Sequence, residues 1–183
     1  MKRITALILL LATSLIIGCS STPPKGLESS VGQQLYTQVG FWTYKNQHET
    51  VNYGVNRFIP VNTQVNINDI NAKVVEFTLS DNGAERVLIN TEKYTHQEMG
   101  EIFFRYFGKK KVDLQGFSSA ERKAIERGEV KKGMSKKAVL LARGYPPAHE
   151  THSTDDNEWK YWNSRFNTMI VYFKDDKVSR IRN

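Results

Sequence analysis

The chain has 183 residues, which is enough for one large domain or two small ones. With 39% hydrophobic, 25% charged and 11% aromatic residues, its composition excludes both a generally disordered chain and a protein with many membrane spans. The net charge of +7 is concentrated in the middle, where residues 105–143 hold 12 Lys and Arg against 4 Asp and Glu.

The start of the chain is typical of an export signal. Lys2 and Arg3 provide a positive charge, and residues 4–17 follow as an uncharged, mostly apolar run of 14 residues. Such a run is short for a bilayer span of roughly 20 residues but suits the apolar region of a signal peptide. It ends just before Cys19, the only cysteine, so an internal disulfide is excluded.

Residues 16–19, Ile-Ile-Gly-Cys, resemble the bacterial lipobox. The resemblance implies that residues 1–18 are a lipoprotein signal peptide and that Cys19 is the lipid attachment site, with a thioether diacylglycerol and an acylated amine. Ser20, which is not the Asp that retains lipoproteins at the inner membrane, implies the outer membrane with the protein facing the periplasm. An ordinary secretory peptide or an N-terminal anchor helix with a buried cysteine is the alternative. Acylation of Cys19 would also exclude a cysteine nucleophile.

A flexible tether is predicted for residues 19–32, which are rich in Ser, Pro and Gly. Residues 33–93 are predicted to form a small β domain, because apolar and polar residues alternate over several short runs and Asn82-Gly83 is a strong hairpin signal. Five short strands with tight turns favour a barrel or sandwich. The stretch NRFIPVNTQVNINDI gives residues 34–92 a resemblance to SH3-like barrels, with Asn62 in place of the usual Gly.

A linking helix and a connector are predicted for residues 94–117. From Thr95 or His96 to Gly108, apolar residues recur at the i, i+3, i+4, i+7 and i+8 positions of a helix with one apolar face. They are Met99, Ile102, Phe103, Tyr106 and Phe107.

Two helices followed by three strands are predicted for residues 118–183. The first helix begins at a capping box formed by Ser118 and Glu121 and ends near Gly128. The second covers residues 136–143, with Ser135 as N-cap and Gly144 as the stop. Three alternating segments follow, around Trp159, Val171 and Val178.

Several residues of this region occur in an order that is similar to the SmpA/OmlA family, the BamE-like outer-membrane lipoproteins. They are Val130, Gly133-Met134-Ser135, Val139, Gly144-x-Pro146, Trp159-x-Tyr161, Val171-x-Phe173 and Val178-x-x-Ile181. The resemblance implies an α+β fold in which residues 118–183 form an ααβββ domain, with two helices on a three-stranded antiparallel sheet. Family members are non-enzymatic parts of the machinery that inserts β-barrel proteins into the outer membrane. The long segment before this domain departs from the compact family members and favours a paralogue with an added ligand-binding domain.

Four lysines flank the start of the second helix, where positive side chains oppose the helix dipole. They are Lys131, Lys132, Lys136 and Lys137. Together with the backbone N–H groups of a helix start, they predict a site for the phosphate of an anionic phospholipid or for an acidic partner loop. A solvated charged face is the alternative. Nucleic acid is not expected as a partner, because an exported protein does not meet it and no stacking motif accompanies the charge.

Aromatic residues near the family motif are candidate partner contacts. Alternation along a strand places Trp159 and Tyr161 on one face, toward the helices, and Trp162 on the other. Trp162 and Tyr145 are therefore predicted as exposed residues that anchor an interface.

Catalytic and metal chemistry find little support in the sequence. His149 and His152 are followed by Asp155 and Asp156, a set that could bind zinc, but a solvent-facing loop is the favoured alternative. No Gly-x-Ser-x-Gly elbow occurs, and the scattered histidines offer no oriented base. We therefore expect no cofactor, no metal and no enzymatic activity.

The sequence supports two hypotheses of function. The first is a lipid-anchored outer-membrane scaffold that binds envelope proteins, β-barrel assembly subunits among them, or supports envelope integrity. The second is an envelope ligand-binding or sensing lipoprotein, whose SH3-like domain binds glycan, peptide or anionic phospholipid.

Overall fold

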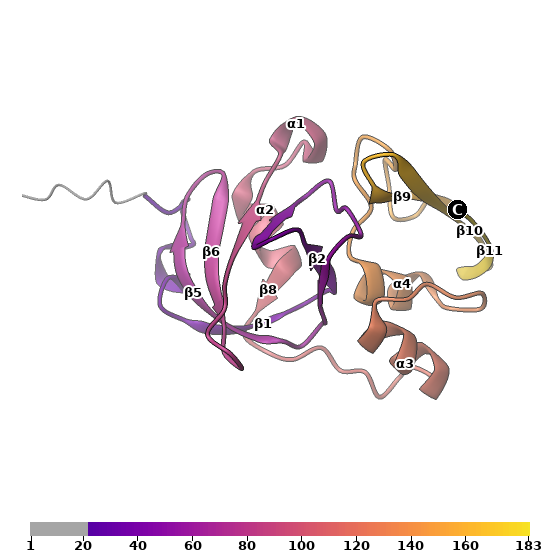
Figure 1. The fold of residues 1–183 in the computed structure, drawn as a ribbon, viewed down its shortest axis with the longest axis horizontal. Helices are drawn as coiled ribbons and strands as arrows, with labels where there is room; N and C mark the ends of the chain where they lie inside the picture. Colours follow the sequence, from indigo (N-terminus) through magenta and orange to yellow (C-terminus); the bar gives the residue numbers. More distant parts are fainter. Residues whose placement is uncertain (1–21) are drawn as a thin grey trace, which may run out of the picture.

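A computed structural model describes residues 22–183 (Figure 1). The predicted signal peptide, the lipobox and Cys19 lie outside these residues. The fold is mixed α+β and consists of two units side by side, residues 22–108 on the left of Figure 1 and residues 119–183 on the right. A segment without helix or strand, residues 109–118, joins them.

The first unit is built on an open six-stranded sheet with the strand order β3-β7-β6-β5-β1-β8. A separate two-stranded sheet pairs β2 with β4, and β3 runs parallel to β7, whereas the other pairs are antiparallel. No strand of the described chain closes this sheet into the barrel that the SH3-like resemblance implies. The elements are η1 (Glu28–Ser30), β1 (Gln34–Thr37), β2 (Phe41–Thr43), β3 (Gln47–Glu49), β4 (Arg57–Ile59), β5 (Gln64–Ile70), β6 (Val74–Leu79), β7 (Glu85–Ile89), α1 (Glu92–Thr95), α2 (Met99–Tyr106) and β8 (Phe107–Gly108).

The central hairpin confirms the sequence pattern. Strands β6 and β7 pair across a turn in which Gly83 has a φ of 68°, as the Asn-Gly signal predicts. Asn62, which replaces the Gly of the SH3-like motif, also lies in the left-handed region, with a φ of 67°, a conformation that asparagine tolerates. Its side-chain amide donates to the carbonyl of Val112 at 2.9 Å and accepts from the Val112 N–H at 2.6 Å. Asparagine at this position therefore fixes both the turn and the connecting segment.

The segment expected to be a flexible tether is partly folded. Leu27, in the turn before η1, is only 1% exposed and belongs to the first hydrophobic core. The Gly32 N–H also donates to the carbonyl of Ile67 in β5 at 2.8 Å. This corrects the predicted tether of residues 19–32, because burial of one leucine attaches its second half to the sheet.

The predicted linking helix belongs to the first unit. Helix α2 begins at Met99, after the short helix α1 and a left-handed residue, His96, which has a φ of 53°. Its apolar face packs into the first core, and β8 directly after it pairs with β1. The structure thus corrects both the start at Thr95 or His96 and the linker assignment, since the chain segment that connects the units is only residues 109–118.

The second unit has the predicted order of two helices and three strands. It contains α3 (Ser119–Arg127), α4 (Lys136–Arg143), β9 (Glu158–Ser164), β10 (Asn167–Lys174) and β11 (Lys177–Arg182). The sheet is antiparallel with the order β11-β10-β9. The capping box of Ser118 and Glu121 and the Ser135 cap are confirmed. The helix ends before Gly144 as predicted, but with a φ of 76° and a ψ of −173° this glycine lies outside the expected left-handed helical region. Within residues 22–183, no helix is both long and apolar enough to span a bilayer.

The second core lies between the two helices and one face of this sheet. Trp159 and Tyr161 are fully buried in it, as alternation predicts, together with Val139 of α4 and Val171 of β10. Val61 of the first unit belongs to the same core. The two units are therefore packed against each other.

Candidate functional site

A buried arginine lies at the junction of the two units. Arg143, the last residue of α4, is 2% exposed. Its Nη1 donates to the side-chain oxygen of Asn52 at 3.2 Å, and its Nη2 donates to the carbonyl of Trp162 at 2.8 Å. The guanidinium also lies over the rings of Trp42, at 4.5 Å, and Tyr161, at 5.2 Å. Burial lowers the pKa of Arg143 to about 10. Since this value is far above neutral pH, the arginine remains a cation.

The end of α4 is capped by the other unit. The Asn52 side-chain amide donates to the carbonyl of Arg143 at 2.8 Å and to that of Tyr145 at 2.9 Å. The Tyr161 hydroxyl donates to the carbonyl of Gly144 at 3.0 Å. Because the last carbonyls of a helix lack partners within it, these bonds satisfy groups whose burial would otherwise cost free energy.

A buried histidine in the first unit, His48, adds to the buried polar groups at the junction. Together with Tyr106 it forms, with Arg143, Asn52 and Tyr161, what we call the polar layer. The His48 Nδ1 lies 2.7 Å from the carbonyl of Trp42, and its Nε2 lies 2.9 Å from the Tyr106 hydroxyl. A carbonyl can only accept, so Nδ1 carries the proton and Nε2 accepts from the tyrosine. Burial lowers the pKa of His48 to about 4 and raises that of Tyr106, so both are neutral at pH 7. These three groups are bonded to one another within the first unit, whereas the bonds of Asn52 to Arg143 and Tyr145 join the two units.

A cleft opens beside this layer, between the α1–α2 region and the segment of residues 145–154. Its volume is about 370 Å³. The side chains that give it chemical character are Thr95, His96, Gln97, Arg105, Tyr145 and His152. The cleft thus draws its lining from both units, and it contains one of the predicted contact residues, Tyr145.

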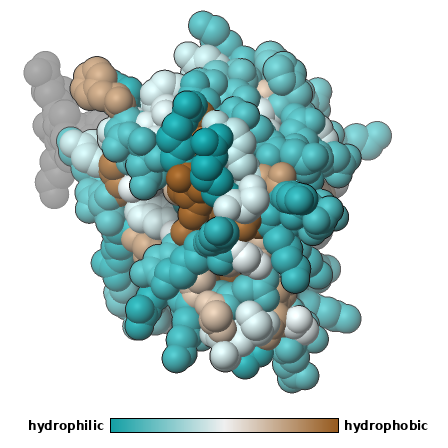
Figure 2. All heavy atoms as spheres, turned by 90° about the vertical axis from the view of Figure 1, so that its right-hand side faces the viewer, coloured by the Kyte–Doolittle hydropathy of each residue, from teal (hydrophilic) through white to brown (hydrophobic). Residues whose placement is uncertain are grey.

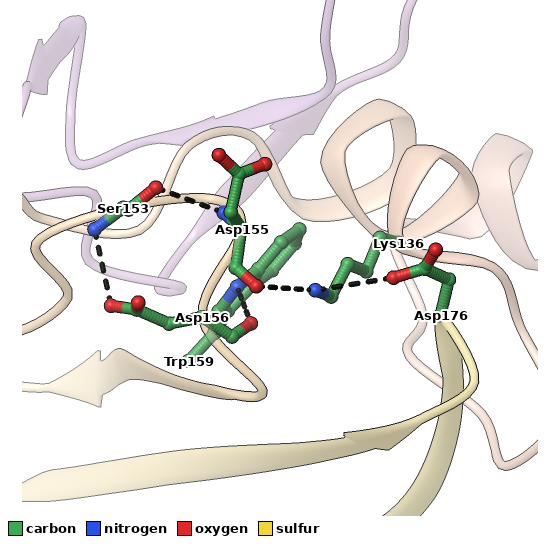
Figure 3. A network of polar contacts seen from close by, with 6 residues as sticks. All are labelled: Lys136, Ser153, Asp155, Asp156, Trp159 and Asp176. Atoms are coloured by element: carbon green, nitrogen blue, oxygen red, sulfur yellow. Dashed lines mark hydrogen bonds and ion pairs between the residues drawn. The ribbon is translucent and has the colours of Figure 1, made fainter.

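Lys136, one of the four predicted lysines, is a structural residue. Its Nζ donates to the carbonyl of Asp155 at 2.8 Å and forms an ion pair with Asp176 at 3.3 Å, and its side chain is only 15% exposed (Figure 3). In the same network, the Asp156 carbonyl accepts from the Trp159 indole at 3.0 Å (Figure 3). Lys136 therefore attaches the loop before β9 to the start of α4.

The donors at the start of α4 already have an acceptor inside the chain. Glu121 of α3 accepts from the Ser135 N–H at 3.0 Å and from its hydroxyl at 2.9 Å. Burial alone would raise the pKa of Glu121, but hydrogen bonds from Ser135 and Ser118 outweigh it and hold the pKa below its usual value. An external anion at this helix start would have to compete with that carboxylate.

The other three lysines remain on the surface. Lys131 pairs with Glu129 at 2.6 Å, Lys137 lies 5.8 Å from the centroid of the Phe117 ring, and Lys132 is exposed. These contacts agree with a solvated charged face. Anion binding by these side chains stays a prediction.

The predicted aromatic contacts are half-buried. Trp162 lies on the sheet face that points away from the helices, with Lys160 over its ring at 5.2 Å and Tyr53 of the first unit 6.4 Å away. Its indole N–H is buried and has no hydrogen-bond partner among residues 22–183. Tyr145 packs against the first core and carries the Arg105 guanidinium over its ring at 4.7 Å.

The sequence does not predict the polar layer. Arg143 at the end of a helix resembles an ordinary basic C-terminal residue, yet it lies four positions after buried Val139 and thus on the same face. That spacing was the available signal, whereas His48 and Asn52 gave none. Of the zinc candidates, the structure brings His152 into the cleft, and no three His, Cys, Asp or Glu side chains of the described chain are grouped as metal ligands.

Comparisons with known proteins give no relative for this chain. No family model matches it, and searches of curated proteins and of solved structures return no match.

Proposed function

We propose that the chain is a lipid-anchored, non-enzymatic interaction protein of the bacterial outer membrane, which supports β-barrel assembly or envelope integrity. One observation carries the proposal. Helices α3 and α4 cover one face of the β9–β11 sheet, the arrangement implied by the SmpA/OmlA resemblance of residues 118–183. The lipobox resemblance at residues 16–19 supports the anchor and the location.

The opposite face of the second sheet is the proposed contact surface. Tyr172 lies on it with the guanidinium of Arg180 4.1 Å above its ring, and Trp162 lies on the neighbouring strand. The β9–β10 turn beside it carries Phe166, which is 93% exposed. Figure 2, which views the molecule from the side of the second unit, shows apolar side chains within a mainly hydrophilic surface. Aromatic residues and arginine are the side chains that most often anchor protein interfaces.

The position of Leu27 fixes how an anchor would orient the molecule. The buried leucine lies eight positions after Cys19, and a fully extended chain covers at most about 3.6 Å per residue, or roughly 30 Å in total. An acylated Cys19 would therefore keep the first unit close to the membrane. The second unit, at the other end of the long axis (Figure 1), would extend toward partners in the periplasm.

The test is recovery of partners from solubilised envelopes with the tagged full chain. We expect β-barrel assembly subunits to be recovered with the parent protein and to be lost with Phe166→Ser. The matched control is Phe104→Ser, since Phe104 is 66% exposed but belongs to α2 of the first unit. Equal recovery with both variants, or no assembly subunit with the parent, would contradict the proposal.

A further inference from the structure

The cleft at the junction has an electropositive lining. It contains Arg105, His96 and His152, and within residues 22–183 none of its lining side chains is Asp or Glu. Arg105 comes from α2, His96 follows α1, and His152 comes from the loop before β9. One guanidinium and two imidazoles from separate segments therefore line a hollow whose described lining includes no carboxylate. Such a lining favours an anion.

Arg105 is positioned to bind that anion. Its guanidinium lies over the Tyr145 ring, 4.7 Å from the centroid, so the side chain is supported by packing. Among the described residues it forms no ion pair, and its side chain makes no hydrogen bond. A guanidinium presents five N–H donors in one plane, a geometry that matches a carboxylate or phosphate in two-point contact. The donors of Arg105 are available for that contact.

One residue of the cleft wall, Gln97, also carries an acceptor without a partner in the described part of the chain. The side-chain oxygen of Gln97 is buried and has no hydrogen-bond partner in residues 22–183. A buried acceptor without a partner costs free energy, and rotation of the Gln97 side chain toward the cleft would let a ligand hydroxyl satisfy it. This favours a hydroxylated body attached to the anionic group.

The size of the cleft limits the ligand further. Its 370 Å³ lies at the lower end of the range for small-molecule sites. The recess next to it, which reaches Ile102 and Tyr106, holds only about 20 Å³. An acyl chain has no place there, which excludes the tail of a phospholipid and leaves a small polar ligand.

We propose that this cleft binds a small hydroxylated ligand that carries one carboxylate or phosphate, a sugar acid or a sugar phosphate. Arg105 holds the oxyanion, His96 and His152 add hydrogen bonds from the two sides, and the Gln97 oxygen accepts from a hydroxyl. The site is separate from the surface proposed for partner binding, because none of its residues lies on the outer face of the second sheet. Its test is therefore independent of partner recovery.

The experiment is calorimetric titration of the full chain in a detergent without sugar or phosphate groups. The probes are glucuronate for the carboxylate, glucose 6-phosphate for the phosphate, and glucose as the neutral match. We expect saturable binding of at least one anionic probe, at least about tenfold tighter than glucose. The anionic probe that binds more tightly shows whether the cleft prefers a carboxylate or a phosphate.

Two variants connect binding to the cleft. Arg105→Gln should weaken binding of the anionic probe by about tenfold or more, because loss of a charged hydrogen bond reduces affinity by that factor. Arg127→Gln, at the exposed end of α3 and outside the cleft, should leave binding unchanged. If Arg105→Gln lowers the thermal midpoint of unfolding, a second variant still tests the cleft. His152→Asn changes an exposed loop residue and should weaken binding of the anionic probe several-fold. Absence of saturable binding, equal binding of glucose, or unchanged affinity in both cleft variants would overturn the proposal.

Discussion

Acidification should destabilise the protein through one buried imidazole, that of His48. This side chain is 1% exposed, and burial lowers its pKa from 6.5 to about 4. In the unfolded chain the imidazole takes up a proton near pH 6.5, whereas in the folded protein it stays neutral down to about pH 4. Between these values the unfolded state binds more protons, so the free energy of unfolding falls as the pH falls.

The size of the effect follows from the shift. One pKa unit corresponds to about 1.4 kcal/mol, so a shift from 6.5 to about 4 gives roughly 3 kcal/mol in full and about 2 to 3 kcal/mol at pH 4.5. The groups around the imidazole do not titrate in this range. The pKa of Arg143 is about 10, and burial raises that of Tyr106 above its usual value of 10.

The assay is urea unfolding of the parent and of His48→Gln at pH 7.5, 6.0, 5.0 and 4.5. Glutamine can still donate to the Trp42 carbonyl and accept from Tyr106 but does not titrate. Carboxylates and the other histidines are common to both proteins and cancel in the difference. We expect the parent to be more stable at pH 7.5 and to lose about 2 to 3 kcal/mol of that advantage by pH 4.5.

A constant difference across the four pH values would refute the reasoning. It would mean that the imidazole reaches water in the folded protein and that burial does not suppress its protonation. His96→Gln is the matched control, because His96 is exposed. We expect this control to keep the pH dependence of the parent.

Three further predictions concern other parts of the chain. Cys19→Ala should remove fatty-acid label and release the protein from the membrane fraction, and retained label would exclude this cysteine as the anchor. Leu27→Ala should lower the free energy of unfolding, measured in urea, by about 2 to 5 kcal/mol, because the leucine is 1% exposed. An unchanged free energy of unfolding would instead support a flexible tether at residues 19–32. Gly54→Ala should cost about 1 to 3 kcal/mol, since a Cβ there collides with the buried Arg143 guanidinium. Gly100→Ala in α2, where a Cβ meets no atom within 4 Å, should instead stabilise by about 0.5 to 1 kcal/mol in the same assay.

The second unit was predictable because its signals are local. The capping box joins Ser118 to Glu121, three residues apart, and Ser135 and Gly144 enclose a helix of eight residues. Each signal acts within a few residues of the chain, so composition and spacing suffice to locate the elements. Clear alternation over segments of six to eight residues then locates the three strands along the chain.

The first unit was harder to predict because its elements depend on distant partners. Strand β8 has two residues and exists because Tyr36 and Gly108, 72 positions apart, pair across the sheet. Strand β3 has three residues and lies parallel to β7. Segments this short show no periodicity, and Leu27 is a single apolar residue in a stretch whose composition indicates a tether. Helix α2 was recognised by its pattern, but its periodicity does not say which core it joins.

The polar layer shows why the cleft could not be derived from the sequence. Asn52 contacts Arg143 and Tyr145, which are more than 90 positions away, and a buried asparagine has no sequence signature that names such partners. Those same bonds fix the first residue of the segment 145–154, which forms one wall of the cleft. The position of Tyr145, and with it that of the Arg105 guanidinium on its ring, therefore depends on Asn52. The groups that join the two units also position the residues that line the cleft. A substitution at Asn52 should therefore lower both the free energy of unfolding and the affinity for the anionic probe.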